Sequence, residues 1–395
     1  MNVVNFPNSP KLQNIIVNSI NNSVNKRITF AEYLNLVLYH PNYGYYNSGA
    51  VKIGATGDFF TSSSLGKDFG ELLAVQFIEM WHTLGCPNPF YLVEMGAGNG
   101  QLAYDILAFL QIDNNCFELI QALKYVIIEQ SPTLIETQKK IVKSFKTFDI
   151  SWRTWNDIPD NTIDGCFFSN ELIDAFPVHL VTKNQGRIQE VYLTIEQDKL
   201  TETIAPVSTE ELIKYFDLVE INLFDPRYSQ NYRTEVNLNA LNWLETLANK
   251  LKRGYILTID YGYTADKYYR PQRNKGTLQC YYQHRRHNNP YVNIGYQDIT
   301  AHADFTALER QGELNNLENI GFTQQGLLLM ALGLGDRLNE LSSGKYDLSQ
   351  IFKRRNTLHQ LIDPTGLGGF GVLLQGKGLT EKERSLRGLI TPPMF

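Results

Sequence analysis

Cysteine is scarce in this sequence, and the cysteines that are present lie far apart. The chain has four, Cys86, Cys116, Cys166 and Cys280, and no two of them form a C-x-x-C pair. Zinc ribbons and thiol–disulfide motifs need such close spacing, so the sequence predicts neither a metal site nor a redox centre. Scattered cysteines also favour a reducing compartment.

Membrane and export signals are missing as well. No apolar run approaches the roughly 20 residues that span a bilayer, which argues against a membrane protein. The first 25 residues contain one lysine and no arginine, so neither a secretory signal nor a transit peptide is visible. We therefore predict a cytoplasmic location.

A surplus of positive charge is also absent. The chain has 36 lysines and arginines against 41 aspartates and glutamates, a formal net charge of −5. This balance argues against nucleic acid or an anionic membrane as the main partner. Residues 276–305 are a local exception, because they mix tyrosines with basic side chains that could stack on RNA. The basic run is short, however, and we favour a structured loop that closes a pocket.

What the sequence does contain is a glycine-rich turn between an apolar run and an amphipathic segment. In residues 91–107, YLVEMGAGNGQLAYDIL, the apolar run ends at Glu94, and Gly96, Gly98 and Gly100 follow. This pattern predicts a buried strand, a turn and a helix. Glycine lets the backbone approach a ligand closely, and the free N–H groups of a helix N-terminus favour a carboxylate or phosphate.

The spacing of these glycines distinguishes between two cofactors. A dinucleotide fingerprint, G-x-G-x-x-G, needs a glycine at position 101, where Gln101 stands. An acid two residues before G-x-G-x-G instead resembles the first motif of class I S-adenosylmethionine methyltransferases. The ammonium and sulfonium groups of that cofactor are complemented by an acid beside the turn. We therefore favour S-adenosylmethionine over NAD.

A second strand is predicted at residues 125–128, about 30 residues after the glycine turn, as a βαβ unit requires. Glu129 ends this strand, where its carboxylate can accept hydrogen bonds from both ribose hydroxyls; the alternative is a surface glutamate. After a third strand, residues 151–159 can flank the adenine ring, with Trp155, Asn156 or Asp157 as the predicted contact. Core packing of the tryptophans in this stretch is equally compatible with the sequence.

A further strand at residues 164–169 runs directly into NELIDAFP. Ligands of open α/β sheets bind at the carboxyl ends of strands, so Asn170, Glu171 and Asp174 are the predicted reacting groups. The spacing of the two acids would place both carboxylates on one face of a helical turn. The alternative is that they cap a helix and interact with its dipole.

The remaining segments indicate an α/β core with additions. Residues 1–85 are interpreted as a helical cap with an irregular lid, and residues 86–177 and 236–378 as the core with a mostly parallel sheet. Residues 178–235 predict a β-hairpin or meander and a short helix, an α+β insertion. The basic tail, residues 379–395, is expected to be mobile.

Helix starts are indicated by Ser9 before a proline and by capping boxes at residues 29–32 and 208–211. Apolar residues with a helical period predict further helices at residues 65–81 and 323–342. We expect the helix at 65–81 to pack directly on the sheet.

These motifs together resemble the MidA family of S-adenosylmethionine-dependent methyltransferases, which includes a mitochondrial arginine methyltransferase that acts in respiratory complex I assembly. The resemblance covers about residues 28–378. Its segments are ITFAEYLNLVLYHPNYGYY, GDFFTSSSLGKDFGELLA, VEMGAGNGQLAYDIL, SNELIDAFPV, IDYGY, and GTLQCYYQH followed by GYQDITAHADF. One departure is Ser63, where the family pattern has proline.

The resemblance implies a Rossmann-like class I methyltransferase fold that uses S-adenosylmethionine and releases S-adenosylhomocysteine. The residues then expected to contact the cofactor are Glu94, Gly96, Gly98, Gly100, Glu129, Asp157 and Asn170. The residues expected to contact the substrate are Asp58, Thr61, Ser62, Tyr261, His284 and His302, with no metal ion. The resemblance also implies a protein substrate, for example a respiratory-complex subunit, and it allows a homodimer.

The predicted reaction is methylation of arginine on a protein. A guanidinium is protonated in water, since its pKa is above about 12, and it has no free lone pair. Glu171 and Asp174 could hold it by paired hydrogen bonds and accept the proton that is released, with Asn170 beside them. The alternatives are methylation of RNA or a small molecule, and a non-catalytic S-adenosylmethionine-binding assembly chaperone.

Overall fold

A mixed sheet of seven strands lies at the centre of the computed structural model, which describes residues 8–48 and 61–390 apart from 284, 343 and 345. In spatial order the strands are β16 (Glu318–Gln324), β17 (Gly371–Lys377), β10 (Leu251–Asp260), β5 (Ile163–Asn170), β2 (Phe90–Met95), β3 (Leu123–Ile128) and β4 (Asp149–Arg153). The strand β17 runs antiparallel to its two neighbours, β10 and β16. The other described pairs in this sheet are parallel. The predicted α/β fold with a mostly parallel sheet is confirmed.

The order of the strands creates a switch point between β2 and β5. The chain continues from β2 to β3 and β4 on one side, and from β5 to β10 on the other side. Helices that follow adjacent strands therefore diverge, and a crevice opens outside the carboxyl ends of these two strands.

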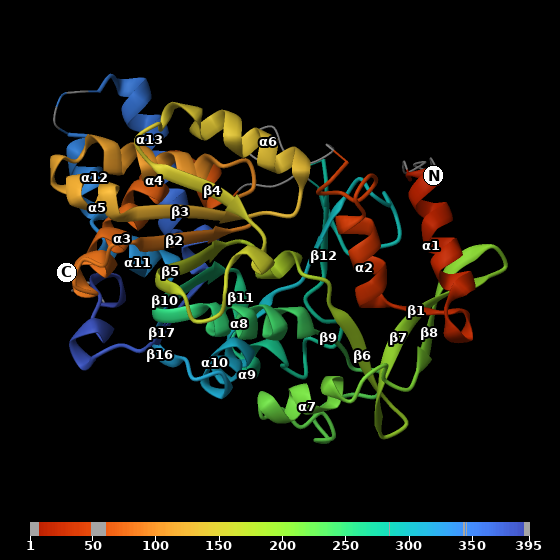
Figure 1. Ribbon diagram of the computed structural model, residues 1–395. Helices are drawn as coiled ribbons and strands as arrows, with labels where there is room; N and C mark the ends of the chain where they lie inside the picture. The colour runs from red at the N-terminus through yellow and green to blue at the C-terminus, as the bar shows by residue number, and fades with distance from the viewer. Residues whose placement is uncertain (1–7, 49–60, 284, 343, 345, 391–395) are drawn as a thin grey trace.

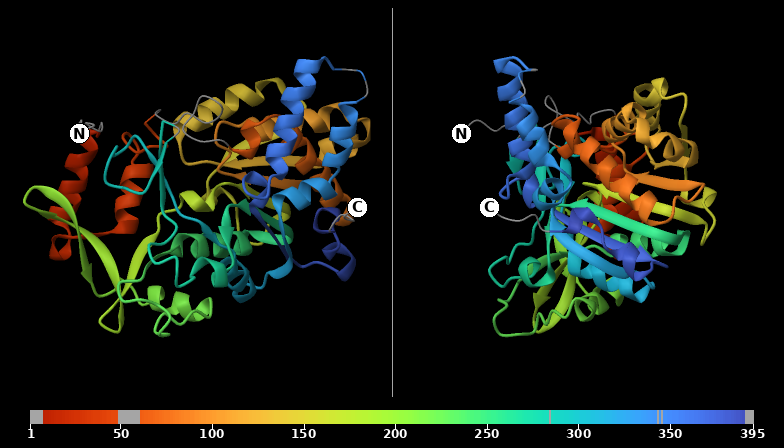
Figure 2. Two further views of the ribbon diagram at one scale, coloured as in Figure 1. Left: turned by 180° about the vertical axis from the view of Figure 1, so that it is seen from behind. Right: turned by 90° about the vertical axis from the view of Figure 1, so that its left-hand side faces the viewer.

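Helices cover both faces of this sheet (Figures 1 and 2). One face carries α3 (Asp68–Thr83), α4 (Gln101–Ile112), α5 (Phe117–Ala122), α6 (Pro132–Ile141), α11 (Gln325–Ala331), α12 (Leu334–Glu340) and α13 (Leu348–Ile362). The other face carries α8 (Leu238–Lys250) and α10 (Phe305–Leu314). Phe77 of α3 packs on Phe168 of β5 with ring centroids 4.8 Å apart, so the predicted packing of this helix on the sheet is confirmed.

A second, antiparallel sheet lies at the other end of the molecule (Figure 1). Its strands are β1 (Ile28–Thr29), β6 (His179–Asn184), β7 (Arg187–Glu196), β8 (Lys199–Ala205) and β9 (Arg233–Val236). The helices α1 (Pro10–Asn22) and α2 (Phe30–Tyr39) pack on it, and α7 (Glu211–Leu218) packs near β6 and β9. The first two helices and the inserted strands therefore form one small lobe, whereas α3 belongs to the large sheet.

Two short sheets connect the lobes. The strands β12 (Gln279–Tyr282), β13 (Arg285–His287) and β14 (Asp298–Thr300) pair antiparallel, and β11 (Gly262–Tyr263) pairs with β15 (Ala303–Asp304) beside the short helix α9 (Ala265–Tyr268). Residues 276–305 were predicted to be a structured loop that closes a pocket. The segment does line the cavity described below, but it contains short strands, which the sequence did not indicate because strands of two to four residues are too short to show an alternating pattern.

The predicted helix starts are confirmed at α1 and α2 and wrong at α7. The side chain of Ser9 accepts a hydrogen bond from Leu12 N, and Thr29 forms a capping box with Glu32. Ser208 forms no such box, because its N–H donates to Glu190 and the helix begins only at Glu211.

Two further expectations are corrected near the C-terminus. Residues 318–324 form the edge strand β16, so the helix expected from residue 323 begins two residues later, and Gly333 separates it into α11 and α12. The tail is not mobile over residues 379–390, because Leu386 is buried and Glu383 pairs with Arg253.

Candidate cofactor and methyl-transfer site

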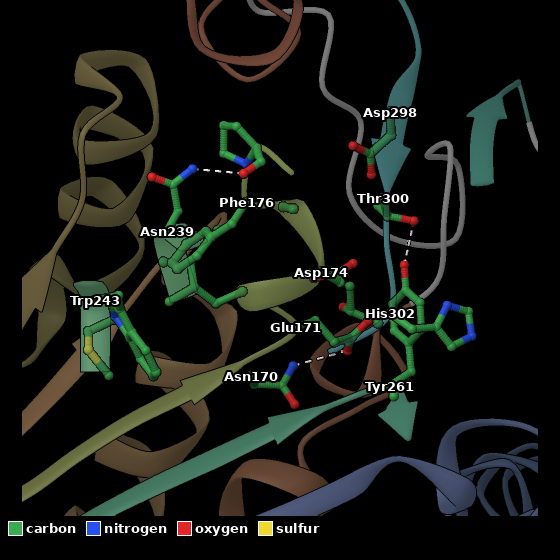
Figure 3. Close-up of a pocket in the computed structure, with 18 of the residues that line it drawn as sticks. Asn170, Glu171, Asp174, Phe176, Asn239, Trp243, Tyr261, Asp298, Thr300 and His302 are labelled. Carbon is green, nitrogen blue, oxygen red and sulfur yellow. Dashed lines mark hydrogen bonds between the residues drawn. The ribbon is translucent and has the colours of Figure 1, made fainter. Parts of the chain in front are cut away.

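A cavity of about 1610 Å³ opens at the switch point, outside the carboxyl ends of β2, β3, β5 and β10. Its lining continues to α8 on one side and to β14 on the other (Figure 3), and residues of α2 and of the segment before β17 also contribute to it. Pockets for single small molecules measure roughly 300–1,000 Å³. This cavity therefore has room for a cofactor and for part of a second molecule.

Glu94 lies at the floor of the cavity, near the end of β2. It is 3% exposed, and the hydroxyl of Tyr125 donates to its Oε2 at 2.7 Å. Burial, together with the nearby charge of Glu129, raises the pKa of Glu94 to about 7. A buried carboxylate in this state gains from a cationic ligand group, because such a group stabilises the ionised form.

The glycine turn has the strained backbone that requires glycine. Gly96, Gly98 and Gly100 have φ values of +67°, +53° and +88°, a region that other residues rarely adopt. A Cβ on Gly96 would come within 2.6 Å of Leu172. Gly96 and Gly98 line the cavity, whereas Gly100 is the N-cap of α4 and packs against Gln138.

Glu129 lines the cavity at the end of β3, next to the glycine turn. Its Oε1 accepts hydrogen bonds from the N–H groups of Gln130 and Ser131, and its Oε2 accepts one from Gln138 Nε2 at 3.2 Å. Gln138 Nε2 also donates to the carbonyl oxygen of Gly98. This network holds the Glu129 carboxylate in place beside the turn, and Oε2 keeps capacity for a ribose hydroxyl.

Asp157 does not line the cavity. Its carboxylate accepts hydrogen bonds from the N–H and the hydroxyl of Thr154, both at 2.8 Å, in a capping box. These contacts hold the pKa of Asp157 below its usual range. The cavity is lined instead by Trp155, whose ring lies 6.3 Å from that of Phe167. The predicted adenine contact of Asp157 therefore has no geometric support.

Asn170 and Glu171 meet the cavity at the end of β5. Glu171 has φ of +52°, a strained value for a residue with a side chain, so it does not lie on a helical turn. Its Oε1 accepts hydrogen bonds from Asn170 Nδ2 and from the N–H of Ser62, both at 3.0 Å. Burial is the main reason why the pKa of Glu171 rises to about 8, and the charge of Asp174 adds to it.

Asp260 fixes the loop that carries these acids. It is fully buried at the end of β10, and its Oδ2 accepts hydrogen bonds from the N–H groups of Leu172, Ile173 and Asp174. Its Oδ1 accepts one from Tyr261 N. Asp260 lies in the segment IDYGY, but its role was not predicted from the sequence. Asp260 can hold this loop only because β5 and β10 are neighbours in the sheet, and no pattern in the sequence predicts that these two strands pair.

The predicted substrate residues fall into three groups. Thr61, Tyr261 and His302 line the cavity, and the rings of Tyr261 and His302 are 4.9 Å apart. Ser62 lies behind the lining, where its N–H supports Glu171 and its hydroxyl donates to Gln325. Asp58 and His284 lie outside the described residues.

His302 is a weak base, although it lines the cavity. Burial, with a smaller effect of Arg273 and Arg286, lowers its pKa to about 4. It is therefore neutral at physiological pH. Its ring packs between those of Tyr261 and Tyr263. Over residues 8–48 and 61–390, with the gaps named above, no group of three His, Cys, Asp or Glu side chains could hold a metal ion.

The residues at the glycine turn fit S-adenosylmethionine. Glu94 can hold the ammonium of its amino-acid end, Gly96 and Gly98 allow close approach, and Glu129 can hold the ribose. Asn170 Oδ1, at the end of β5, is buried and has no hydrogen-bond partner among the described residues. A mostly parallel sheet with an acid-flanked glycine turn at its switch point defines a Rossmann-like S-adenosylmethionine-dependent methyltransferase.

Comparison with known proteins agrees with this class. The family model of S-adenosyl-L-methionine-dependent methyltransferases matches residues 72–323, so the chain belongs to this family, the MidA-like methyltransferases. It is 30% identical to the human protein arginine methyltransferase NDUFAF7, mitochondrial, over 86% of this chain and 78% of that protein. The Drosophila melanogaster homolog is 28% identical over 86% of this chain and 79% of that protein.

Solved structures show the same architecture. A COG1565 superfamily member from Burkholderia thailandensis, bound to S-adenosyl-homocysteine, is 28% identical with a TM-score of 0.81, and the match covers 97% of each chain. A native structure of a COG1565 protein from the same organism is 26% identical with a TM-score of 0.80 and the same coverage. Fold class, cofactor and enzyme class are thereby confirmed. The human and Drosophila melanogaster relatives are named as mitochondrial proteins, and the cytoplasmic location of this chain stays a prediction.

The raised pKa of Glu94 gives a testable pH dependence of cofactor binding. Only the ionised carboxylate attracts an ammonium, so affinity for S-adenosylhomocysteine should rise as the pH increases through about 7. Between pH 6 and pH 8 we expect an increase of about tenfold, measured by isothermal titration calorimetry. Glu94→Gln should bind more weakly at pH 8 and show no such slope. An unchanged slope in that variant would assign the titration to another group.

Proposed function

We propose that this protein transfers the methyl group of S-adenosylmethionine to an arginine side chain of a protein substrate. The observation that carries the proposal is that two acids, Glu171 and Asp174, lie together in the cavity (Figure 3). They line the part of the cavity next to the end of β5, beside the glycine turn. A guanidinium is the cationic side chain that carboxylates bind in a fixed plane.

The chain's own residues can perform the proton chemistry. When bound, S-adenosylmethionine supplies an electrophilic methyl group and leaves as S-adenosylhomocysteine. The attacking guanidinium nitrogen forms the new N–C bond and loses one proton. Oε2 of Glu171 has no hydrogen-bond partner among the described residues, whereas its Oε1 is fixed by Asn170 and Ser62. Glu171 therefore accepts the proton on Oε2, and its raised pKa of about 8 suits a group that must bind and release protons near neutral pH.

Two observations support arginine as the acceptor over the alternatives. The described residues of the cavity beyond the turn present several acids and few basic side chains, an arrangement that repels the phosphates of RNA. The curated relatives are named protein arginine methyltransferases. A respiratory-complex subunit as the substrate, and a homodimer, remain predictions from the sequence resemblance.

Labelled S-adenosylmethionine tests the proposed acceptor. The purified protein is incubated with host lysate fractions of protein, RNA and small molecules, and labelled products are separated and analysed by mass spectrometry. We expect label in protein, on arginine, and a loss of the label with Glu171→Gln. Label only in RNA or small molecules would overturn the proposal. Tight S-adenosylmethionine binding without labelled product in any fraction would favour the assembly chaperone.

A further inference from the structure

The cavity has a second acidic side, away from the glycine turn. Asp174 comes from the loop after β5, and Asp298 begins β14, more than a hundred residues later. Both line the cavity, and they are only 7% and 3% exposed. Figure 3 shows the two side chains on the same side of the cavity, with Thr300 and Tyr261 beside them. The positions of Asp174 and Asp298 in the sequence do not predict that their side chains lie on the same side of the cavity.

One oxygen of the Asp174 carboxylate, Oδ1, is buried and has no hydrogen-bond partner among the described residues. Burial and the negative charges of Asp260 and Asp298 raise the pKa of Asp174 well above its usual range. A buried acid beside other acids is stabilised in its ionised form by a cation, so the site favours a positively charged ligand group.

Two tyrosines of the small lobe hold this acidic side in place. The hydroxyl of Tyr46 donates to Oδ1 of Asp298 at 2.7 Å, and the hydroxyl of Tyr39 donates at 2.8 Å to the carbonyl oxygen of Ala175, next to Asp174. The two rings stack with centroids 5.3 Å apart, and both residues line the cavity. They supply aromatic rings to the cavity lining, in contact with Asp298 and with the backbone next to Asp174.

We infer that Asp174 and Asp298, with the Tyr39–Tyr46 pair, bind the planar cation of the methyl acceptor, and that Asp298 sets a preference for guanidinium over ammonium. This inference rests on the proposed function, whose substrate subsite it defines. A guanidinium offers donors along several edges of one plane and stacks on aromatic rings, so two carboxylates and a tyrosine can engage it together. An ammonium is a compact point charge and gains less from this arrangement.

The probe for this subsite is N-acetyl-L-arginine methylamide, titrated into the protein saturated with S-adenosylhomocysteine and followed by ligand-observed NMR. The matching lysine derivative serves as the ammonium probe. The wild type should bind the arginine probe at least about fivefold more tightly than the lysine probe. Asp298→Asn should weaken binding of the arginine probe by about tenfold or more and reduce the preference. Asp217→Asn, the same change on the exposed face of α7, should leave both affinities unchanged.

Tyr46→Phe is a second variant, with a smaller change in structure. It removes only the hydroxyl that donates to Asp298, and we expect about threefold weaker binding of the arginine probe. Affinity for S-adenosylhomocysteine, measured by calorimetry, should match the wild type in every variant and reports that the fold is intact. If Asp298→Asn binds S-adenosylhomocysteine normally and the arginine probe as tightly as the wild type does, the inference is overturned.

The two proposals can fail separately. Binding of the arginine probe that depends on Asp298, without methylated arginine in any protein, would support the subsite and overturn the proposed function. Methylation of an arginine peptide with an unchanged KM in Asp298→Asn would overturn the subsite and support the function.

Discussion

Glu171→Gln should lower the rate of methyl transfer by about a hundredfold or more while the affinity for S-adenosylhomocysteine stays within about twofold of the wild type. The amide oxygen of Gln can still accept the hydrogen bonds from Ser62 and Asn170, so the strained turn at the end of β5 keeps its support. What is lost is the ionised oxygen that accepts a proton. Single-turnover transfer of labelled methyl to protein measures the rate, and calorimetry measures the affinity.

The pH profile of the wild type gives an independent check on this assignment. Glu171 must be ionised to accept a proton, and its pKa is raised to about 8, so the rate should increase as the pH rises from 7 towards 9 and then level off. Glu210→Gln, a change of the same kind at an exposed position before α7, should leave rate and profile unchanged. A Glu171→Gln enzyme that retains more than a tenth of the wild-type rate would assign the proton to another group.

Asp260→Ala should produce the largest loss of stability among the site residues, about 3 kcal/mol or more in the free energy of unfolding. The substitution leaves four N–H groups without their acceptor: those of residues 173 and 174 are buried, and those of residues 172 and 261 are partly buried. Each unsatisfied buried donor costs about 1–3 kcal/mol, and water entry recovers part of the sum. Urea denaturation measures the change.

Asp260→Asn is the matched control for this prediction. It retains one carbonyl oxygen for the loop after β5 and places an amide N–H₂ against Tyr261 N, so its loss should be clearly smaller than that of alanine. Any folded fraction of Asp260→Ala should also transfer methyl groups poorly, since the loop positions Glu171 and Asp174. An unfolding free energy within 1 kcal/mol of the wild type would show that the loop does not depend on this carboxylate.

Local rules predicted the strand, the glycine turn and the helix on which the proposed cofactor contacts lie. The strand, the glycine turn and the following helix occupy neighbouring positions in the chain, and the positive φ values of Gly96, Gly98 and Gly100 are a local requirement. Helix caps formed by residues a few positions apart, such as Thr29 with Glu32, were predicted for the same reason. Where a distant partner competes, as Glu190 does for Ser208, the local prediction was wrong.

The acceptor half of the cavity depends on contacts between distant segments. Asp298, Tyr46 and Asp174 come from three segments, and the Tyr46–Asp298 hydrogen bond joins residues 252 positions apart. Asp174 was predicted from its place after a strand, but no neighbour in sequence indicates the role of Asp298 or Tyr46. The short strand β14 carries too few residues for a periodic pattern, so its place beside the cavity was not predictable.

By itself, the sequence determined the fold class, the glycine turn and the order of strands and helices along the core, because hydrophobic periodicity, glycine spacing and capping act over a few residues. Only the tertiary structure decided which strands are neighbours, that Asp260 anchors the loop after β5, and that the first helices complete the acidic side of the cavity. The physical reason is that burial raises the pKa of a carboxyl group, and a buried carboxylate favours a cation, only where distant segments exclude water together.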